Sequence, residues 1–123
     1  MATILHVCTS CRPPDHPGDT GARPGQDMLA WLSAAIPADA QISLHGANCL
    51  SVCKRPCTIA VSAPGKWSYV IGNLEPARDG AALLDYLAQY AAAADGVTPL
   101  RQRPAPIRAG IIARLPPAPA LQG

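Results

Sequence analysis

Residues 49–57 have the sequence Cys-Leu-Ser-Val-Cys-Lys-Arg-Pro-Cys and connect two segments that we expect to be strands, 40–47 and 58–62. A second cysteine pair, Cys8 and Cys11, lies at the end of an expected first strand, Thr3–Cys8, whose residues are mostly apolar or β-branched. Loops at the same end of neighbouring strands can lie side by side. The spacing therefore predicts a site in which four or five sulfur atoms from distant parts of the chain come together.

The rest of the chain predicts an α/β domain with the element order β-α-β-β-β-α. Apolar residues at helical spacing follow Asp27 and end at Pro37, which predicts a helix capped by Asp27. The strands expected at 58–62 and 67–71 are close enough in sequence to form a hairpin. The last helix is expected to be capped by Asp79 and to end at Asp95 and Gly96.

A change in composition divides the chain into an expected domain, residues 1–96, and a Pro/Arg-rich C-terminal extension, residues 97–123. The first part has six Lys/Arg and eight Asp/Glu, a net charge of −2, whereas the second has four Arg and no acid, a net charge of +4. Six prolines predict extended or polyproline-like chain in the extension. We expect the apolar patch 107–115 to dock on its own domain, and the arginines to be solvated charges that bind no nucleic acid.

Length and composition limit the class of protein. The 123 residues, 49% apolar and 15% charged, suit one globular core. No apolar stretch reaches the roughly 20 residues of a membrane span. The first residues lack the basic region and long apolar stretch of a secretory signal, so we expect a cytoplasmic protein without membrane association. The five cysteines then need an explanation other than a disulfide framework.

Three kinds of site fit the cysteine spacing. Soft thiolate ligands select zinc, copper(I) or iron–sulfur clusters. A structural zinc site and a [2Fe–2S] cluster both use four ligands, and spacing alone does not separate them. A dithiol redox site would need only Cys8 and Cys11, and it would leave the three cysteines of 49–57 unexplained.

The segment Cys49–Pro56 resembles the C-L-G-x-C segment of the thioredoxin-like [2Fe–2S] ferredoxins and of the related small subunit of respiratory complex I. In that family a cysteine pair after the first strand and a C-x3-C pair after the next hold the cluster at one end of the sheet. The resemblance implies a thioredoxin-like fold and one [2Fe–2S] cluster that transfers single electrons. The ligands that it implies are Cys8, Cys11, Cys49 and Cys53.

The chain departs from the ferredoxin pattern at three points. Cys8 and Cys11 are more closely spaced than the first ferredoxin pair, Ser51 replaces a glycine, and Cys57 is an additional cysteine. These departures concern mainly the second ligand, for which Cys11 is the first choice and Cys57 the substitute. If it is not a ligand, Cys57 is expected to pack under the loop as a small apolar residue.

A wider resemblance covers most of residues 4–116. It is to a bacterial family of predicted metal-binding proteins that are often found near cobalamin-biosynthesis genes, and it implies a role in cobalamin or other metal-linked metabolism. The matching segments are Val7–Arg12, Cys49–Thr58, Ala63–Trp67 and Gly110–Arg114.

Other candidate residues receive supporting roles. The histidines His6, His16 and His45 are expected not to be ligands. Arg12, Lys54 and Arg55 flank the cysteines and would raise a cluster's reduction potential or guide an acidic redox partner.

The remaining features concern assembly and catalysis. Trp67 and Tyr69 alternate along a strand and are expected in the core or in a homodimer interface. The chain has one glutamate, Glu75, and no nucleophile–base or phosphate-binding motif, so we expect no enzymatic activity.

Overall fold

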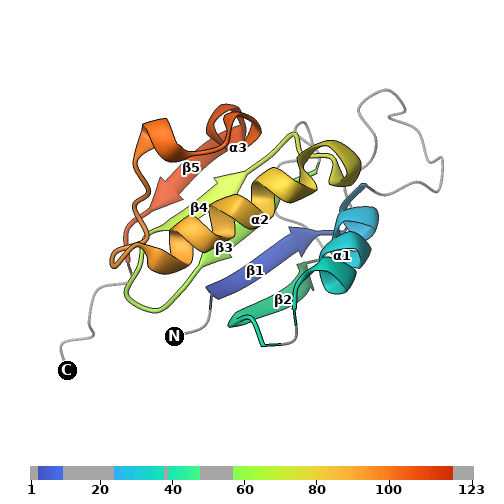
Figure 1. Cartoon of the computed structure of the whole chain (residues 1–123), viewed down its shortest axis with the longest axis horizontal. Helices are drawn as coiled ribbons and strands as arrows, with labels where there is room; N and C mark the ends of the chain where they lie inside the picture. Colours follow the sequence, from blue (N-terminus) through green and yellow to red (C-terminus); the bar gives the residue numbers. More distant parts are fainter. Residues whose placement is uncertain (1–2, 10–23, 38, 48–56, 118–123) are drawn as a thin grey trace.

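The computed structural model of the chain describes residues 3–9, 24–37, 39–47 and 57–117. These residues form a mixed α/β structure (Figure 1). The strands are β1 (Thr3–Cys8), β2 (Ile42–Ala47), β3 (Ile59–Ser62), β4 (Ser68–Ile71) and β5 (Ile111–Leu115). The helices are α1 (Pro24–Ala35), α2 (Pro76–Ala92) and α3 (Ala105–Gly110), with a 3-10 turn at Leu100–Gln102.

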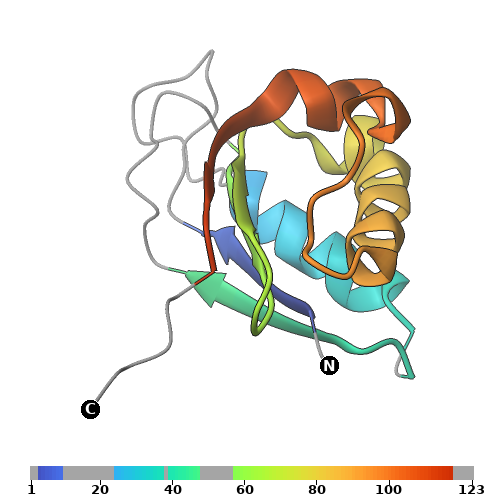
Figure 2. The ribbon, with the colours of Figure 1, turned by 90° about the vertical axis from the view of Figure 1, so that its left-hand side faces the viewer.

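The strands form one sheet in the order β2-β1-β3-β4-β5. β1 and β2 are parallel, and every other neighbouring pair is antiparallel. Helices α1 and α2 cover one face of this sheet (Figure 2). The opposite face, from which strand residues project away from α1 and α2, is called the helix-free face below. The predicted thioredoxin-like order β-α-β-β-β-α is confirmed and is followed by α3 and β5.

The core lies between the sheet and the two long helices. Alternate strand residues point into it because successive side chains of a strand project to opposite faces. Helix α2 contributes residues spaced three and four positions apart, which place one stripe of side chains against the sheet. The fully buried large side chains include Leu5, Ile59, Tyr69, Ile71, Leu83, Tyr86 and Tyr90.

Three tyrosines occupy the centre of this core. The rings of Tyr69, Tyr86 and Tyr90 lie with centroids 6.1–6.4 Å apart, and Tyr69 meets the other two edge to face. The Tyr90 hydroxyl donates to the carbonyl of Trp67 at 2.6 Å, and burial raises the pKa of Tyr90 to about 12. Tyr69 is therefore a core residue, as predicted, and Trp67 packs against the core while partly exposed.

The polyproline-like conformation predicted for the C-terminal segment is wrong for residues 100–115. This segment folds into a turn, helix α3 and strand β5, which pairs with β4. The prolines are compatible with this structure because Pro104 is the N-cap of α3 and Pro106 lies in its first turn, where no backbone donor is required. Docking of the 107–115 patch on its own domain is confirmed: Ile107 is fully buried and β5 extends the sheet.

Two of the arginines expected to be solvated charges make specific contacts. Arg103 donates to the Thr98 carbonyl at 2.8 Å and to the Tyr69 hydroxyl at 3.3 Å. The guanidinium of Arg114 lies 4.6 Å from the centre of the Trp67 ring, a cation–π contact. The contacts with Tyr69 and Trp67 attach the C-terminal segment to the domain. Together with the bond to Thr98, they correct the expectation of simple solvated charges.

The helix starts also differ from expectation. Helix α1 begins at Pro24, so Asp27 lies in its first turn and is not its cap. Helix α2 begins at Pro76 with Glu75 as N-cap, and Asp79 lies within the first turn. In both cases a proline occupies the first helical position, where its fixed φ favours the helix and its missing N–H is not needed. In the described part of the chain, no helix is long and apolar enough to cross a membrane.

Candidate functional site

Three chain segments that lead to cysteines meet at one end of the sheet, called the cysteine end below. Cys8 is the last residue of β1 and lies opposite Ala47, the last residue of the parallel strand β2. The backbone N–H of Thr9 donates to the Ala47 carbonyl at 2.8 Å, and that of Cys8 donates to the Thr58 carbonyl, just before antiparallel β3, at 2.9 Å. The backbone at Thr9, Ala47 and Thr58 is therefore close together. In the sequence, Thr9 shortly precedes Cys11, Ala47 shortly precedes Cys49, and Thr58 follows Cys53 and Cys57.

Two of the five cysteines lie within the described residues, and their surroundings differ. Cys57 is fully buried and belongs to the core cluster. Cys8 is 2% exposed, and it alternates along β1 with Val7, which points into that core. This burial agrees with the packing expected of Cys57 if it is not a ligand. The ligand assignment stays a prediction because Cys11, Cys49 and Cys53 lie outside the described residues.

The N-termini of both long helices lie at the cysteine end. Gly25, in the first turn of α1, is so close to β1 that a Cβ atom there would overlap the Cys8 carbonyl oxygen. Two residues before α2, Leu74 exchanges backbone hydrogen bonds of 3.2 and 3.3 Å with Cys57. The partial positive charge of a helix N-terminus stabilises thiolates and other anions. This end of the sheet consequently favours a negatively charged group.

A buried carboxylate organises the start of α2. Asp79 is 1% exposed, and Arg78 donates to its two oxygens at 2.8 and 2.9 Å. The backbone N–H of Glu75 donates to the same carboxylate at 2.9 Å. The Arg78 hydrogen bonds, opposed in part by burial, hold the pKa of Asp79 below its usual range.

This carboxylate makes the protein sensitive to acid. The pKa of Asp79 is lower in the folded state than in the unfolded state, so its ionised carboxylate stabilises the fold. This stabilisation is fully present above the unfolded-state pKa and is lost as pH falls through the folded-state pKa. We expect Asp79→Asn to cost about 1–3 kcal/mol of unfolding free energy near pH 7, in line with charged hydrogen bonds. The difference from wild type should shrink below about pH 4. Urea titrations over this pH range measure it, and a difference that is independent of pH would contradict the assignment.

The other residues predicted to be near the site divide into two groups. Arg12, His16, Lys54 and Arg55 lie outside the described residues. The rings of His6 and His45 stack with centroids 5.4 Å apart on neighbouring strands, and the Ser43 hydroxyl lies 2.6 Å from Nε2 of His45. Over the residues that the structure describes, no group of three or more His, Cys, Asp and Glu side chains is arranged to hold a metal ion.

Sequence reasoning did not identify Arg78 as part of this end of the molecule. Its side chain is 60% exposed, and one of its guanidinium nitrogen atoms also donates to the Asn73 carbonyl at 3.0 Å. The available signal was a Pro-x-Arg-Asp sequence at the start of a helix, beginning at Pro76. Adjacent helix residues do not ordinarily face each other, so this sequence alone did not predict the contact.

The fold and the position of the cysteine end define a class of protein. The chain has a thioredoxin-like fold. It is similar to the structure of a thioredoxin-like [2Fe–2S] ferredoxin from Aquifex aeolicus, with a TM-score of 0.62 and 18% identity over 97% of this chain and 98% of that one. A crystal structure of the wild-type thioredoxin-like [2Fe–2S] ferredoxin from Aquifex aeolicus gives a TM-score of 0.59 and 19% identity, covering 91% and 97%.

At this level of identity the likeness shows the fold alone. The chain belongs to the family described as "Protein of unknown function (DUF1636)", whose model matches residues 5–117. A comparison with curated proteins found no match.

Proposed function

We propose that this protein binds one [2Fe–2S] cluster through Cys8, Cys11, Cys49 and Cys53 and transfers single electrons between redox proteins. The observation that carries the proposal is the meeting of the ends of β1 and β2 and the chain preceding β3 at one end of the sheet. Each of these ends leads directly into a cysteine-containing segment. The similar structures are of [2Fe–2S] ferredoxins with the same fold, which supports this choice of cluster.

The described part of the site fits such a group. Thiolate is the ligand that iron–sulfur clusters use, and Cys8 is nearly excluded from solvent. A bound [2Fe–2S] cluster stores and releases one electron. The chain supplies the thiolates, restricts solvent access at Cys8, and stabilises negative charge with the N-termini of α1 and α2, which lie close to Cys8 and Cys57.

The biological setting is part of the same proposal. We propose a cytoplasmic electron carrier that has no catalytic activity of its own and works with a reductase and an electron acceptor. A place in cobalamin or other metal-linked metabolism is proposed from the family resemblance at the cysteine segments.

Metal and sulfide analysis tests the function directly. Protein purified without oxygen is expected to be reddish brown and to contain iron and acid-labile sulfide in equal amounts. A colourless protein with stoichiometric zinc would overturn the proposal in favour of a zinc or other metal-binding structural or trafficking protein. A protein without metal that cycles between dithiol and disulfide would favour the dithiol alternative.

We also propose that the protein is a homodimer that uses the helix-free face. Val70 and Ala113 lie side by side on this face, and Leu115, the neighbour of Ser68, is 56% exposed. Alternate residues of each strand project from this face. Among the strand residues that the structure describes, none of those on this face is Asp, Glu, Lys or Arg. A weakly charged sheet face of this kind suits association with a second copy.

Light scattering is expected to report a dimer over a wide concentration range. Ala113→Glu places a charge on the helix-free face and should shift the protein toward monomer. Ala88→Glu places the same charge at an exposed position on α2 and serves as the control. A wild-type monomer at all concentrations, or equal effects of the two variants, would refute this interface.

A further inference from the structure

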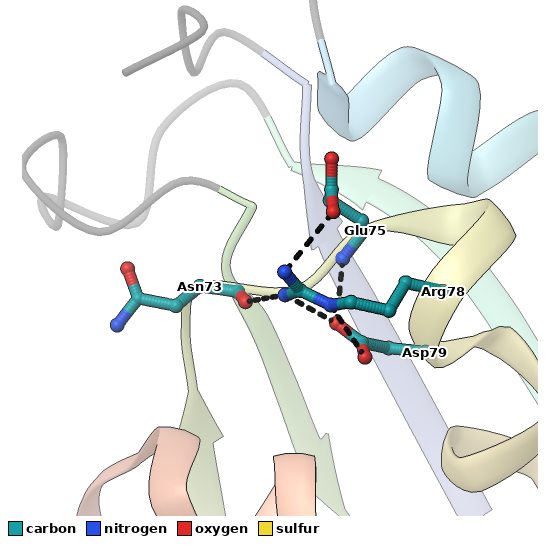
Figure 3. A network of polar contacts seen from close by, with 4 residues as sticks. All are labelled: Asn73, Glu75, Arg78 and Asp79. Atoms are coloured by element: carbon teal, nitrogen blue, oxygen red, sulfur yellow. Dashed lines mark hydrogen bonds and ion pairs between the residues drawn. The ribbon is translucent and has the colours of Figure 1, made fainter. Parts of the chain in front are cut away.

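Arg78 and Asp79, called the Arg78–Asp79 clamp below, hold two consecutive peptide groups of the chain before α2 (Figure 3). Arg78 Nη2 donates to the Asn73 carbonyl at 3.0 Å, which belongs to the peptide between residues 73 and 74. The Asp79 carboxylate accepts from the Glu75 N–H at 2.9 Å, which belongs to the next peptide. The clamp therefore bonds one polar group on each side of Leu74.

The remaining polar groups of the same two peptides bond to Cys57. The Leu74 N–H donates to the Cys57 carbonyl at 3.2 Å, and the Cys57 N–H donates to the Leu74 carbonyl at 3.3 Å. Each peptide is thus bonded to the clamp at one end and to Cys57 at the other. Fixing these two peptides fixes the backbone of Cys57, the last residue of the cysteine-rich segment 49–57.

Two further features make this connection rigid. The Leu74 side chain is 1% exposed and belongs to the core cluster, so its peptides are held from the core as well. Asn73 has φ = 61°, in the left-handed region, which asparagine tolerates better than most residues. The clamp thereby holds a turn that the backbone alone would adopt less readily.

We propose that Arg78 and Asp79 are positioning residues for the cysteine site: they anchor the backbone of Cys57, which follows the proposed ligands Cys49 and Cys53 in the chain, and they thereby favour retention of the metal centre. The identity of that centre as [2Fe–2S] rests on the proposed function, whereas the anchoring of Cys57 does not. The paired hydrogen bonds from Arg78 to Asp79 require the planar fork of a guanidinium, which a lysine ammonium does not reproduce. Arg78→Lys therefore separates positioning from charge, because it keeps the charge and loses the fork.

The test compares Asp79→Asn and Arg78→Lys with Asp85→Asn and Arg108→Lys, which make the same changes at exposed positions in α2 and α3. In the metal-loaded proteins, both clamp variants are expected to lose metal to a chelator faster, by about tenfold or more, as for other residues that orient ligands. The visible circular dichroism of the remaining cluster should also change. Hydrogen exchange at the Cys57 and Leu74 amides should accelerate, while the Leu5 amide of β1 stays protected.

The outcomes separate this inference from the proposed function. Clamp variants that retain metal and amide protection like their controls would overturn the inference. A normal Arg78→Lys beside a defective Asp79→Asn would also overturn it, because charge alone would then suffice. If the wild-type protein holds zinc, the proposed function fails, but chelation of zinc from the same variants tests the clamp. If it holds no metal, accelerated exchange at Cys57 and Leu74 supports the anchoring of Cys57, and unchanged exchange refutes it.

Discussion

The Cys8→Ser protein is expected to be colourless and free of iron after anaerobic purification. Cys8 ends β1 beside Ala47, the last residue of β2, and Thr58, just before β3, and its side chain is 2% exposed. Serine has nearly the same size but supplies a hydroxyl in place of a thiolate, so a site with four thiolate ligands loses one of them. The visible absorption spectrum and the iron content per chain measure the effect.

Cys57→Ala provides the matched control. This cysteine is fully buried in the core cluster, so its loss is expected to lower stability modestly and to leave the spectrum nearly unchanged. If the Cys11→Ser variant keeps its iron and the Cys57→Ala variant loses it, Cys57 is the fourth ligand. Retention of the full cluster by Cys8→Ser would contradict the site itself.

Gly25→Ala is expected to destabilise the fold by about 3 kcal/mol, because overpacking against a fixed backbone costs energy on this scale. A Cβ at this position would overlap the Cys8 carbonyl oxygen and lie 3.2 Å from Cα of Thr9. Both are backbone atoms, and they cannot move aside unless β1 or α1 shifts. The direction of the stability change is informative, because Gly→Ala at an unconstrained helix position raises the free energy of unfolding by up to about 1 kcal/mol.

Urea denaturation measures this effect, with Gln26→Ala as the control at an exposed neighbouring position. The variant should also lose bound metal more readily, because displacing α1 displaces the Cys8 peptide. An unchanged or increased stability of Gly25→Ala would show that α1 does not approach β1 this closely.

The local pattern of the chain was sufficient to predict most of the elements. The first strand was predicted with its observed bounds, Thr3–Cys8, because apolar side chains and β-branching are properties of the segment itself. The strands at 42–47, 59–62 and 68–71 and the two long helices were also predicted, to within a few residues at their ends. The cysteine spacing indicated the candidate site, because only two loops carry all five cysteines.

Tertiary structure alone decided the C-terminal segment. Residues 111–115 have no strict alternation and lie among prolines, so local preference favoured an irregular tail. They form β5 because β4, about 40 positions earlier in the chain, presents an unpaired edge and because Ile107 finds a buried position. A pairing between such distant segments is not encoded in the pattern of either one.

The same distinction applies to the cysteine end. The order of the residues determined that cysteines follow the first two strands, whereas the placement of β1 between β2 and β3 determined that their loops are neighbours. The Arg78–Asp79 clamp depends on the turn at Asn73 and on the two bonds between Leu74 and Cys57. Local sequence fixes dihedral preferences and hydrophobic faces, but hydrogen bonds between distant peptides form only after the chain has folded.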